Sequence, residues 1–384
     1  RVLVHVCRVL YQSLESSVPP NLFVVDQCGS NVTGLDVSVQ DRISILKRLS
    51  ETLRTSDNER VVLIGDVMLD RYHHGYANNL NSTAPVPVLK ITHTEENAGA
   101  AAHIAQSLSS LGITVDFHSA VGKDADGDTI LNNLKKLEVN TTGVQVIENH
   151  LTMVKTRYFG SRESLLDRPQ IMLQTDIEDP DGIPDIISSR IRNDAVQNVK
   201  GSTAIVISDY DKGVISKESA RSLIEEAAKH NIPVVMDPKL TGLDRSGGAT
   251  IVIFERRGLD LLRRRLGKEN ARDAAMELVK KHGWGAILVL GGNTGVTLYH
   301  SDGSIVYTPS SIVNPRQQIG LHDAAASAIS FALGNGHNLI ESSILASAAC
   351  DCILESKHGD SILTRESLML RIDEISWTMQ ISDR

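Results

Sequence analysis

AIVISDYDKG (Ala204–Gly213) and PVVMDPK (Pro233–Lys239) are short apolar runs that end in polar residues, and a helical pattern over Ser216–His230 separates them. TIVIFE (Thr250–Glu255) and AILVLGG (Ala286–Gly292) repeat the pattern further along the chain. Runs this rich in β-branched residues are typical of strands that are buried on both faces. Strands that alternate with helices predict crossover connections and a mainly parallel sheet covered by helices on both faces. The sequence therefore predicts an α/β fold.

The segment before this region extends the same sheet. RVVLIG (Arg60–Gly65) predicts another buried strand, and the apolar spacing over Gln40–Thr55 predicts an amphipathic helix that leads into it. Asp66 and Asp70 follow this strand. Open α/β sheets bind ligands beyond the carboxyl ends of their strands, where carboxylates can accept hydrogen bonds from sugar hydroxyls. Two solvated acids in a turn explain the pattern equally well.

Three segments outside this alternation predict short strands. APVPVLKI (Ala84–Ile91) is interrupted by prolines, which restrict it to an edge strand or a flap. Met153–Phe159 and Ile171–Ile177 alternate or run apolar and predict a second flap. We expect residues 84–91 and 153–159 to pair with each other. The acidic run Asp124–Thr129 predicts a solvated turn before a helix from Ile130, because it lacks the Glu of a calcium-binding loop.

QIGLHDAAASAISFAL (Gln318–Leu333) combines a Gly, an Asp three residues later and an Ala-rich helical pattern. The N-terminus of a helix carries unpaired N–H groups and a partial positive charge, so it can bind an anion such as a phosphate. Asp323 at such a corner can act as general base toward a hydroxyl that is brought up to the phosphate. It can also cap its own helix, and the stretch alone favours this simpler role.

The composition argues against two classes of partner. The chain has 384 residues, a formal net charge of −8 and 4% aromatic residues, which argues against direct binding of nucleic acid. No apolar run approaches the roughly 20 residues that a membrane-spanning helix needs. The cysteines lack the spacing of a zinc site, so core cysteines in a reducing compartment are expected; they are Cys7, Cys28, Cys350 and Cys352.

Residues 1–38 precede the predicted fold. Residues 15–38 mix Ser, Pro, Gly and Asn without a period, so we expect an N-terminal extension that could wrap a protein partner. The first 14 residues contain Arg1, His5 and Arg8 and no acidic residue, which resembles the end of an organelle-targeting segment; an ordinary extension is the alternative. We therefore expect a soluble protein of the cytoplasm or of an organelle matrix or stroma.

Four motifs stand in order along the chain, and they are GDVMLDRY (Gly65–Tyr72), TAPVPV (Thr83–Val88), SDYDKG (Ser208–Gly213) and DPK (Asp237–Lys239). With the Gly-to-Asp motif before the Ala-rich helix, they resemble the ribokinase or PfkB family of carbohydrate kinases, and within it the kinases of D-glycero-β-D-manno-heptose 7-phosphate. The resemblance covers about residues 40–370. It implies a ribokinase-like three-layer α/β/α sandwich over residues 39–384, with a mainly parallel sheet and a small β lid from about residues 72–96 and 151–178.

The same resemblance implies ATP with magnesium as phosphoryl donor and a sugar phosphate as acceptor. It makes Asp323 the general base, and it assigns the other site residues to three groups. They are Gly320, Leu321 and His322 for the anion hole; Asp66, Asp70, Gly99 and His103 for the sugar; and Lys239, Asp209, Glu255 and Gly292 for the nucleotide side. No residue is expected to be a direct metal ligand.

The chain departs from the family pattern at residues that would take part in catalysis. The family motif Gly-Ala-Gly-Asp reads Gly320-Leu321-His322-Asp323 here, and side chains at Leu321 and His322 are expected to narrow the anion pocket. A positive φ at the second of these residues would add strain of roughly 1–2 kcal/mol.

Two further motifs depart as well. The family's Asn-x-x-Glu reads Glu255-Arg256-Arg257-Gly258, which removes an acid and adds cations near magnesium, and the Asn of the sugar segment is His103. The Thr that usually follows the strand at 288–289 is Leu290.

These changes predict a pseudokinase that serves as a structural or regulatory subunit of a larger assembly and needs no cofactor. A homodimer through the lid is also expected, because such flaps join two subunits in relatives. The alternative is an active ATP- and magnesium-dependent carbohydrate kinase that phosphorylates a heptose 7-phosphate or a similar sugar phosphate, with Asp323 as general base. A third hypothesis is a sensor that binds a sugar or nucleotide without chemistry.

Overall fold

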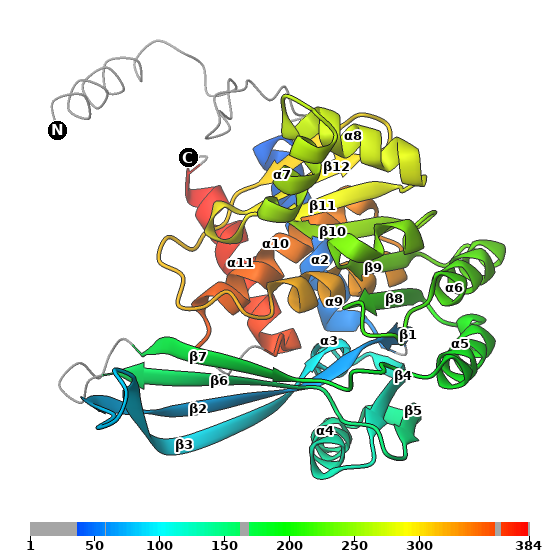
Figure 1. Ribbon diagram of the computed structural model, residues 1–384. Helices are drawn as coiled ribbons and strands as arrows, with labels where there is room; N and C mark the ends of the chain where they lie inside the picture. Colours follow the sequence, from blue (N-terminus) through cyan, green and yellow to red (C-terminus); the bar gives the residue numbers. More distant parts are fainter. Residues whose placement is uncertain (1–36, 58, 162–168, 358–361, 383–384) are drawn as a thin grey trace, which may run out of the picture. The chain divides into compact units, whose positions relative to one another are not determined.

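Nine strands form the central sheet of the computed structural model, in the order β13-β12-β11-β10-β9-β8-β1-β4-β5 (Figure 1). The structure describes residues 37–57, 59–161, 169–357 and 362–382. The strands from β11 to β5 run parallel, and β12 and β13 add an antiparallel pair at one edge. Their bounds are β1 Arg60–Gly65, β4 Thr114–Gly122, β5 Asn140–Ile147, β8 Ala204–Asp209, β9 Val234–Pro238, β10 Ile251–Glu255, β11 Ala286–Leu290, β12 Val296–His300 and β13 Ile305–Thr308. The predicted mainly parallel sheet is confirmed, and its strands predicted at residues 60–65, 204–208, 233–237, 250–254 and 286–290 each lie within one residue of their observed ends.

Helices cover both faces of this sheet. On one face α3, α9 and α10 pack against the strands, with α2 and α11 outside them, and on the other face lie α5, α6, α7 and α8 (Figure 1). Their bounds, with α4, are α2 Val39–Thr55, α3 Ala101–Ser110, α4 Ala125–Lys136, α5 Asp185–Val199, α6 Lys217–Lys229, α7 Arg256–Arg265, α8 Ala271–His282, α9 Leu321–Gly334, α10 Leu339–Glu355 and α11 Arg365–Ser382.

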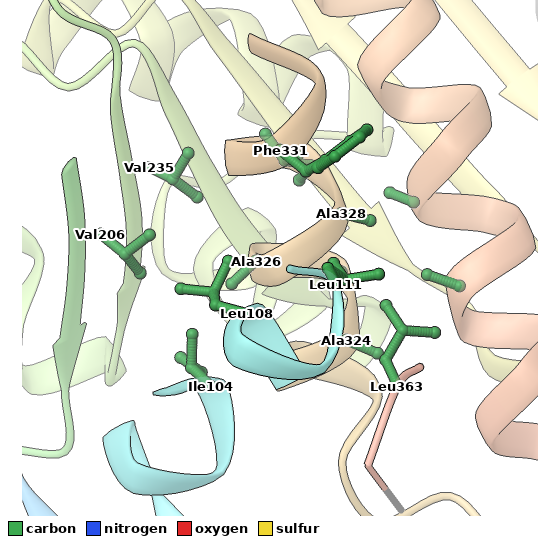
Figure 2. Packing of buried hydrophobic residues seen from close by; sticks show 14 of the residues in the cluster. Ile104, Leu108, Leu111, Val206, Val235, Ala324, Ala326, Ala328, Phe331 and Leu363 are labelled. Carbon is green, nitrogen blue, oxygen red and sulfur yellow. The ribbon is translucent and has the colours of Figure 1, made fainter. Parts of the chain in front are cut away.

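The main apolar core lies between the sheet and α9. Figure 2 shows Leu108 of α3, Val206 of β8 and Phe331 of α9 within it. The alanines of α9 are fully buried, so this helix can approach the strands closely. The Ala-rich pattern of the sequence is therefore the pattern of a core helix, and the core fixes the position of its first turn.

A second sheet of four strands forms the lid, in the order β3-β2-β6-β7. Its strands are β2 Val67–Leu80, β3 Pro87–Ala100, β6 Val154–Ser161 and β7 Gln170–Ile177. The expected pairing of β6 with β7 is confirmed. The expected direct pairing of residues 84–91 with 153–159 is wrong, because β2 lies between β3 and β6 and pairs with both. The GDVMLDRY motif continues as a strand rather than as a turn.

The acidic run at residues 124–129 is not the predicted turn. It forms the first turn of α4, where the Asp124 side chain accepts a hydrogen bond from the N–H of Gly127 at 2.8 Å. Acidic residues in the first turn suit the positive end of a helix, so α4 begins five residues earlier than expected.

The N-terminal extension predicted for residues 1–38 lies almost wholly outside the described residues. The helix expected next is confirmed as α2, whose Leu46, Leu49 and Leu53 are buried and belong to the main core. Cys350 is buried as expected and Cys352 is partly buried, whereas Cys7 and Cys28 lie outside the described residues. No helix in the part of the chain that the structure describes is long and apolar enough to cross a membrane.

The packing of α2 gives a first testable prediction. Leu49→Ala should lower the free energy of unfolding by about 2–5 kcal/mol, because it removes a fully buried side chain and leaves a cavity. Lys47→Ala, at an exposed position of the same helix, should change it by less than about 0.5 kcal/mol. Unfolding of both variants in denaturant measures the difference, and equal values would contradict the packing of α2 into the core.

Candidate functional site

The site is organised around the first turn of α9. Gly320 has φ 91° and ψ 3°, a left-handed conformation that favours glycine, and α9 starts at the next residue. Asp323 is the third residue of the helix and is nearly buried, close to N–H groups that have no partner within the helix. The predicted helix N-terminus and its carboxylate therefore lie together, and the binding of an anion there stays a prediction.

Two expectations for this turn are wrong. Leu321 is 8% exposed and its side chain belongs to the apolar core, so it does not narrow an anion pocket. His322 has no positive φ, so the strain expected at this position is absent. The sequence contained the signal for Leu321, because Leu321, Ala324, Ala325 and Ala328 follow the spacing of a buried helix face.

The His322 ring contacts an acid from the neighbouring strand. Its Nδ1 lies 2.7 Å from Oδ1 of Asp237 at the end of β9. Burial acts to lower the pKa of His322, but the charge and hydrogen bond of Asp237 outweigh it, and the pKa lies above its ordinary value. Burial likewise acts to raise the pKa of Asp237, but His322 and Lys239 bring it below its ordinary value. Each residue of the pair therefore favours the charged form of the other.

Asp323 has a histidine partner of its own. Its Oδ2 lies 3.0 Å from Nδ1 of His103 on α3, and both side chains are nearly buried. Burial acts to lower the pKa of His103, but the hydrogen bond to Asp323 and the charges of Asp323 and Asp70 raise it above its ordinary value. Two residues from distant parts of the sequence, one predicted as base and one as sugar ligand, thus form an ion pair.

Asp70 is held by the lid. Its Oδ1 accepts a hydrogen bond of 2.6 Å from Nη1 of Arg157 on β6, and the Arg157 guanidinium also lies 5.3 Å from the ring centroid of Tyr72. Burial raises the pKa of Asp70, although Arg157 opposes this. A Cβ at Gly99 would lie 2.1 Å from Oδ2 of Asp70, so only glycine fits beside this carboxylate.

Asp66 performs a structural role. Its carboxylate accepts hydrogen bonds of 2.9–3.1 Å from the N–H groups of Tyr210, Lys212 and Val214. Burial raises the pKa of Asp66 to about 6, against the effect of these donors. Asp66 also lines a cavity of about 490 Å³ whose lining, among the described residues, contains neither Asp70 nor Asp323. Its expected contact with a sugar stays a prediction.

The nucleotide-side residues are more dispersed. Asp209 is fully buried and both of its oxygens accept hydrogen bonds from Arg245, at 2.6 and 3.1 Å. Lys239 is exposed, and its Nζ lies 4.1 Å from the ring centroid of Tyr210. Glu255 is exposed just before α7, and Gly292 takes a left-handed φ of 61° beyond β11.

The partly buried Tyr210 marks the centre of the site, and it belongs to the SDYDKG motif although it was not among the predicted site residues. Its pKa is raised well above the ordinary value by burial and by the charges of four acids, which are Asp323, Asp237, Asp70 and Asp66. The structure therefore brings the predicted base and the predicted sugar-side acids together. Arg157 and Arg245 were not predictable from the sequence, because they lie 87 and 36 residues from their partners Asp70 and Asp209.

The comparisons with known proteins agree with this geometry. The sequence pattern of the pfkB family carbohydrate kinases matches residues 58–365. The chain belongs to the pfkB family of carbohydrate kinases.

Two bacterial relatives of this pfkB-family chain are bifunctional proteins named HldE. The one from Actinobacillus pleuropneumoniae serotype 5b (strain L20) is 29% identical over 313 residues, which cover 81% of this chain and 63% of that protein. The one from Vibrio atlanticus (strain LGP32) is 30% identical over 310 residues, which cover 79% of this chain and 61% of that protein. The chain thus spans less than two thirds of the length of these relatives.

Solved pfkB-type structures share the fold. Phosphofructokinase-2 from Escherichia coli in complex with fructose-6-phosphate aligns with a TM-score of 0.66 and 16% identity, covering 83% of this chain and 99% of that one. Arabidopsis thaliana ribokinase complexed with ribose and ATP aligns with a TM-score of 0.62 and 17% identity, covering 83% and 99%. The predicted ribokinase-like α/β fold is confirmed.

The His103–Asp323 pair should make folding stability depend on pH. The pKa of His103 lies above its ordinary value of 6.5 in the folded protein, so the folded state holds this proton more tightly than the unfolded state. The stabilising contribution is complete below about pH 6.5 and disappears as the pH rises through the folded pKa. The wild type should therefore exceed His103→Asn in free energy of unfolding by on the order of 1–3 kcal/mol more at about pH 6 than at about pH 9.

NMR titration of the ring protons provides an internal control. The buried His118 should titrate below 6.5, because burial lowers its pKa, whereas His103 should titrate above it. A stability difference between the wild type and His103→Asn that does not change with pH would contradict the ionised pair.

Proposed function

We propose that this pfkB-family chain is a pseudokinase that serves as a structural or regulatory subunit of a larger assembly. The observation that carries the proposal is that two histidines, at positions where the family resemblance implies Asn and Gly, bind the acids of the site itself. His103 holds Asp323 and His322 holds Asp237. Both contacts come from side chains that the expected motifs lack.

The pair with His103 opposes general-base catalysis. A general base needs an accessible oxygen within hydrogen-bond reach of the substrate hydroxyl. Oδ2 of Asp323 is already 3.0 Å from the His103 ring, and the Asp323 side chain is 10% exposed. A sugar hydroxyl must displace His103 before it can reach Oδ2, and Oδ1, the oxygen of Asp323 without a hydrogen-bond partner among the described residues, is buried.

The pair with His322 opposes phosphate binding. Glycine at the second position of a helix leaves the backbone N–H groups open to an anion. Here an imidazole occupies this position, and its orientation is fixed by the 2.7 Å contact with Asp237. Phosphoryl transfer depends on positioning and charge stabilisation, and loss of one such donor typically costs about 2.7–4 kcal/mol.

The residues on the metal side do not fit magnesium. Gly258 stands where the resemblance implies a Glu, and the neighbouring Arg256 and Arg257 are exposed cations. Asp209 binds Arg245 through both oxygens, so it has no oxygen left for direct metal contact without breaking a buried ion pair. ATP with magnesium is therefore not part of the proposed function.

The lid supports a protein partner. All eight residues of β7 are exposed, and β7 is an edge strand whose Ile171, Leu173 and Ile177 are each about half exposed. Val88 and Ile91 on β3 are similarly exposed. Apolar surface of this kind on a soluble domain marks an interaction site, and either a second copy of this chain or another subunit could cover it.

An active carbohydrate kinase is the second candidate. It is favoured by the position of Asp323 in the first turn of α9 and by the exposed Lys239. Its substrate would be a heptose 7-phosphate or a similar sugar phosphate, with ATP and magnesium as donor.

Calorimetry and a transfer assay separate the two candidates. We expect no saturable heat when ATP with magnesium is added to the wild type, and no ADP formed with heptose 7-phosphate above the rate of an Asp323→Asn control. The physical reason is that the general base, the anion hole and the metal side are each blocked or incomplete. Micromolar binding of the nucleotide together with transfer abolished by Asp323→Asn would establish the active kinase.

Restoring the family residues should recover activity only in combination. His103→Asn with His322→Gly should remain inactive, because the metal-side acid is still missing. Addition of Gly258→Glu should raise transfer by about a hundredfold or more over that double variant. The new side chain has room, since a Cβ at Gly258 meets only ordinary contacts of 3.6 Å and longer.

Leu321 must be retained in these variants, because Leu321→Ala would open a cavity in the core. Activity in the double variant without Gly258→Glu would show that the histidines alone block catalysis.

A further inference from the structure

The lid contains a β-bulge between β2 and β3. His74 pairs with His93, but the next residue, Gly75, pairs with Ile91, so Thr92 is the extra residue. A Cβ at Gly75 would lie 2.1 Å from the carbonyl oxygen of Lys90, which shows how closely the strands approach here. Bulges redirect side chains and are common at functional sites.

Three side chains with metal-binding atoms gather beside this bulge. His74 and His93 are cross-strand partners, and Glu95 is two residues from His93, so all three lie on one face of the lid. One ligand atom from each lies within 4.8 Å of the others. The His74 ring is stacked between His93 at 4.6 Å and Phe159 at 5.1 Å, which fixes its plane.

Hydrogen bonds set the tautomer of His93. The Thr92 hydroxyl donates its proton to the carbonyl oxygen of His74 at 3.0 Å. At its 3.3 Å contact with Nδ1 of His93 it can therefore only accept, so Nδ1 carries the proton. The lone pair of a neutral His93 is then on Nε2, which lies 3.6 Å from a carboxylate oxygen of Glu95. In the neutral ring both of these atoms are electron-rich, so either a proton on Nε2 or a metal ion between them satisfies the contact.

We propose that His74, His93 and Glu95 bind a zinc ion on the lid. Two imidazole nitrogens and one carboxylate oxygen are a donor set that zinc prefers, with metal–ligand distances of about 2.0–2.2 Å and a fourth position left for water. Tetrahedral coordination places ligand atoms about 3.4 Å apart, so the side chains must close by up to roughly 1.4 Å, and His93 must turn out of its stack on His74, because a ring nitrogen binds a metal in the plane of its ring. His93 and Glu95 are free to do so, because their side chains are 56% and 42% exposed.

Thr92 supports the site from outside the ligand set. Metal-bound histidines usually donate their second ring N–H to an oxygen, which orients the ring. The contact of His93 with Thr92 has this form. A bound ion would hold β3 against β2 at the bulge. The proposal uses no residue of the Asp323 site, so it stands independently of whether the chain transfers phosphate.

Calorimetric titration of the full chain with zinc chloride tests the site. The wild type should bind one ion with defined stoichiometry, and His93→Ala or Glu95→Gln should weaken that binding by about a hundredfold or more. Thr92→Val should weaken it by about tenfold, because it removes only the orienting contact. His73→Ala is the matched control, since its ring lies on the opposite face of β2 against Thr94 and Tyr158 and should leave affinity unchanged.

Cobalt substitution provides an independent readout. Addition of Co²⁺ should give the visible absorption of a tetrahedral ion in the wild type and in His73→Ala, and this absorption should be absent in His93→Ala. Melting curves without metal verify that each variant is folded. Equal zinc affinity in the wild type, His93→Ala and Glu95→Gln, or no saturable binding in the wild type, would overturn the proposal. The side chains of His93 and Glu95 would then be joined only by a proton on the His93 ring.

Discussion

A single buried aspartate joins the parts of the molecule on which the site depends. The backbone N–H of Asp66, just beyond β1, donates to the carbonyl oxygen of Ser208 on β8, and the Asp66 carbonyl accepts from the N–H of Ala101 at the start of α3. Its carboxylate accepts three N–H groups of the loop after β8, which carries Tyr210. Gly65 beside it cannot take a side chain, because a Cβ would lie 2.4 Å from the carbonyl oxygen of Ser208. Two central strands, the helix of His103 and the loop of Tyr210 are thus fixed at one point.

Around this point, the charged groups neutralise one another. Buried ion pairs repay the cost of removing charge from water only with good geometry, and they hold side chains in fixed positions. In this site such pairs engage Asp323, Asp237 and Asp70 with His103, His322 and Arg157. A ligand that reaches these acids would therefore have to compete with existing pairs, although Oδ1 of Asp323 has no hydrogen-bond partner among the described residues. The proposed loss of phosphoryl transfer would in this way leave the scaffold intact.

The sequence predicted the features that depend on local pattern and missed those that depend on distant contacts. The strands from β8 to β11 were predictable because their apolar runs are short and clearly bounded. The course of β2 was not, because only its pairing with β3 and β6 distinguishes it from a turn. The family resemblance located Asp323 and His103 but could not show that they contact each other. Leu321 was misjudged as a pocket residue, although its helical spacing already pointed to the core.

The edge strand β7 has a consequence for the abundance of this chain. Its eight exposed residues include four large apolar side chains and one acid, and no strand in the described part of the chain pairs with its outer edge. An edge of this kind is a template for non-specific strand addition, which native proteins usually prevent with charge, proline or a cover. When no partner covers β7, copies of this chain will tend to aggregate or be degraded. The amount of this chain that accumulates then depends on how completely that edge is covered.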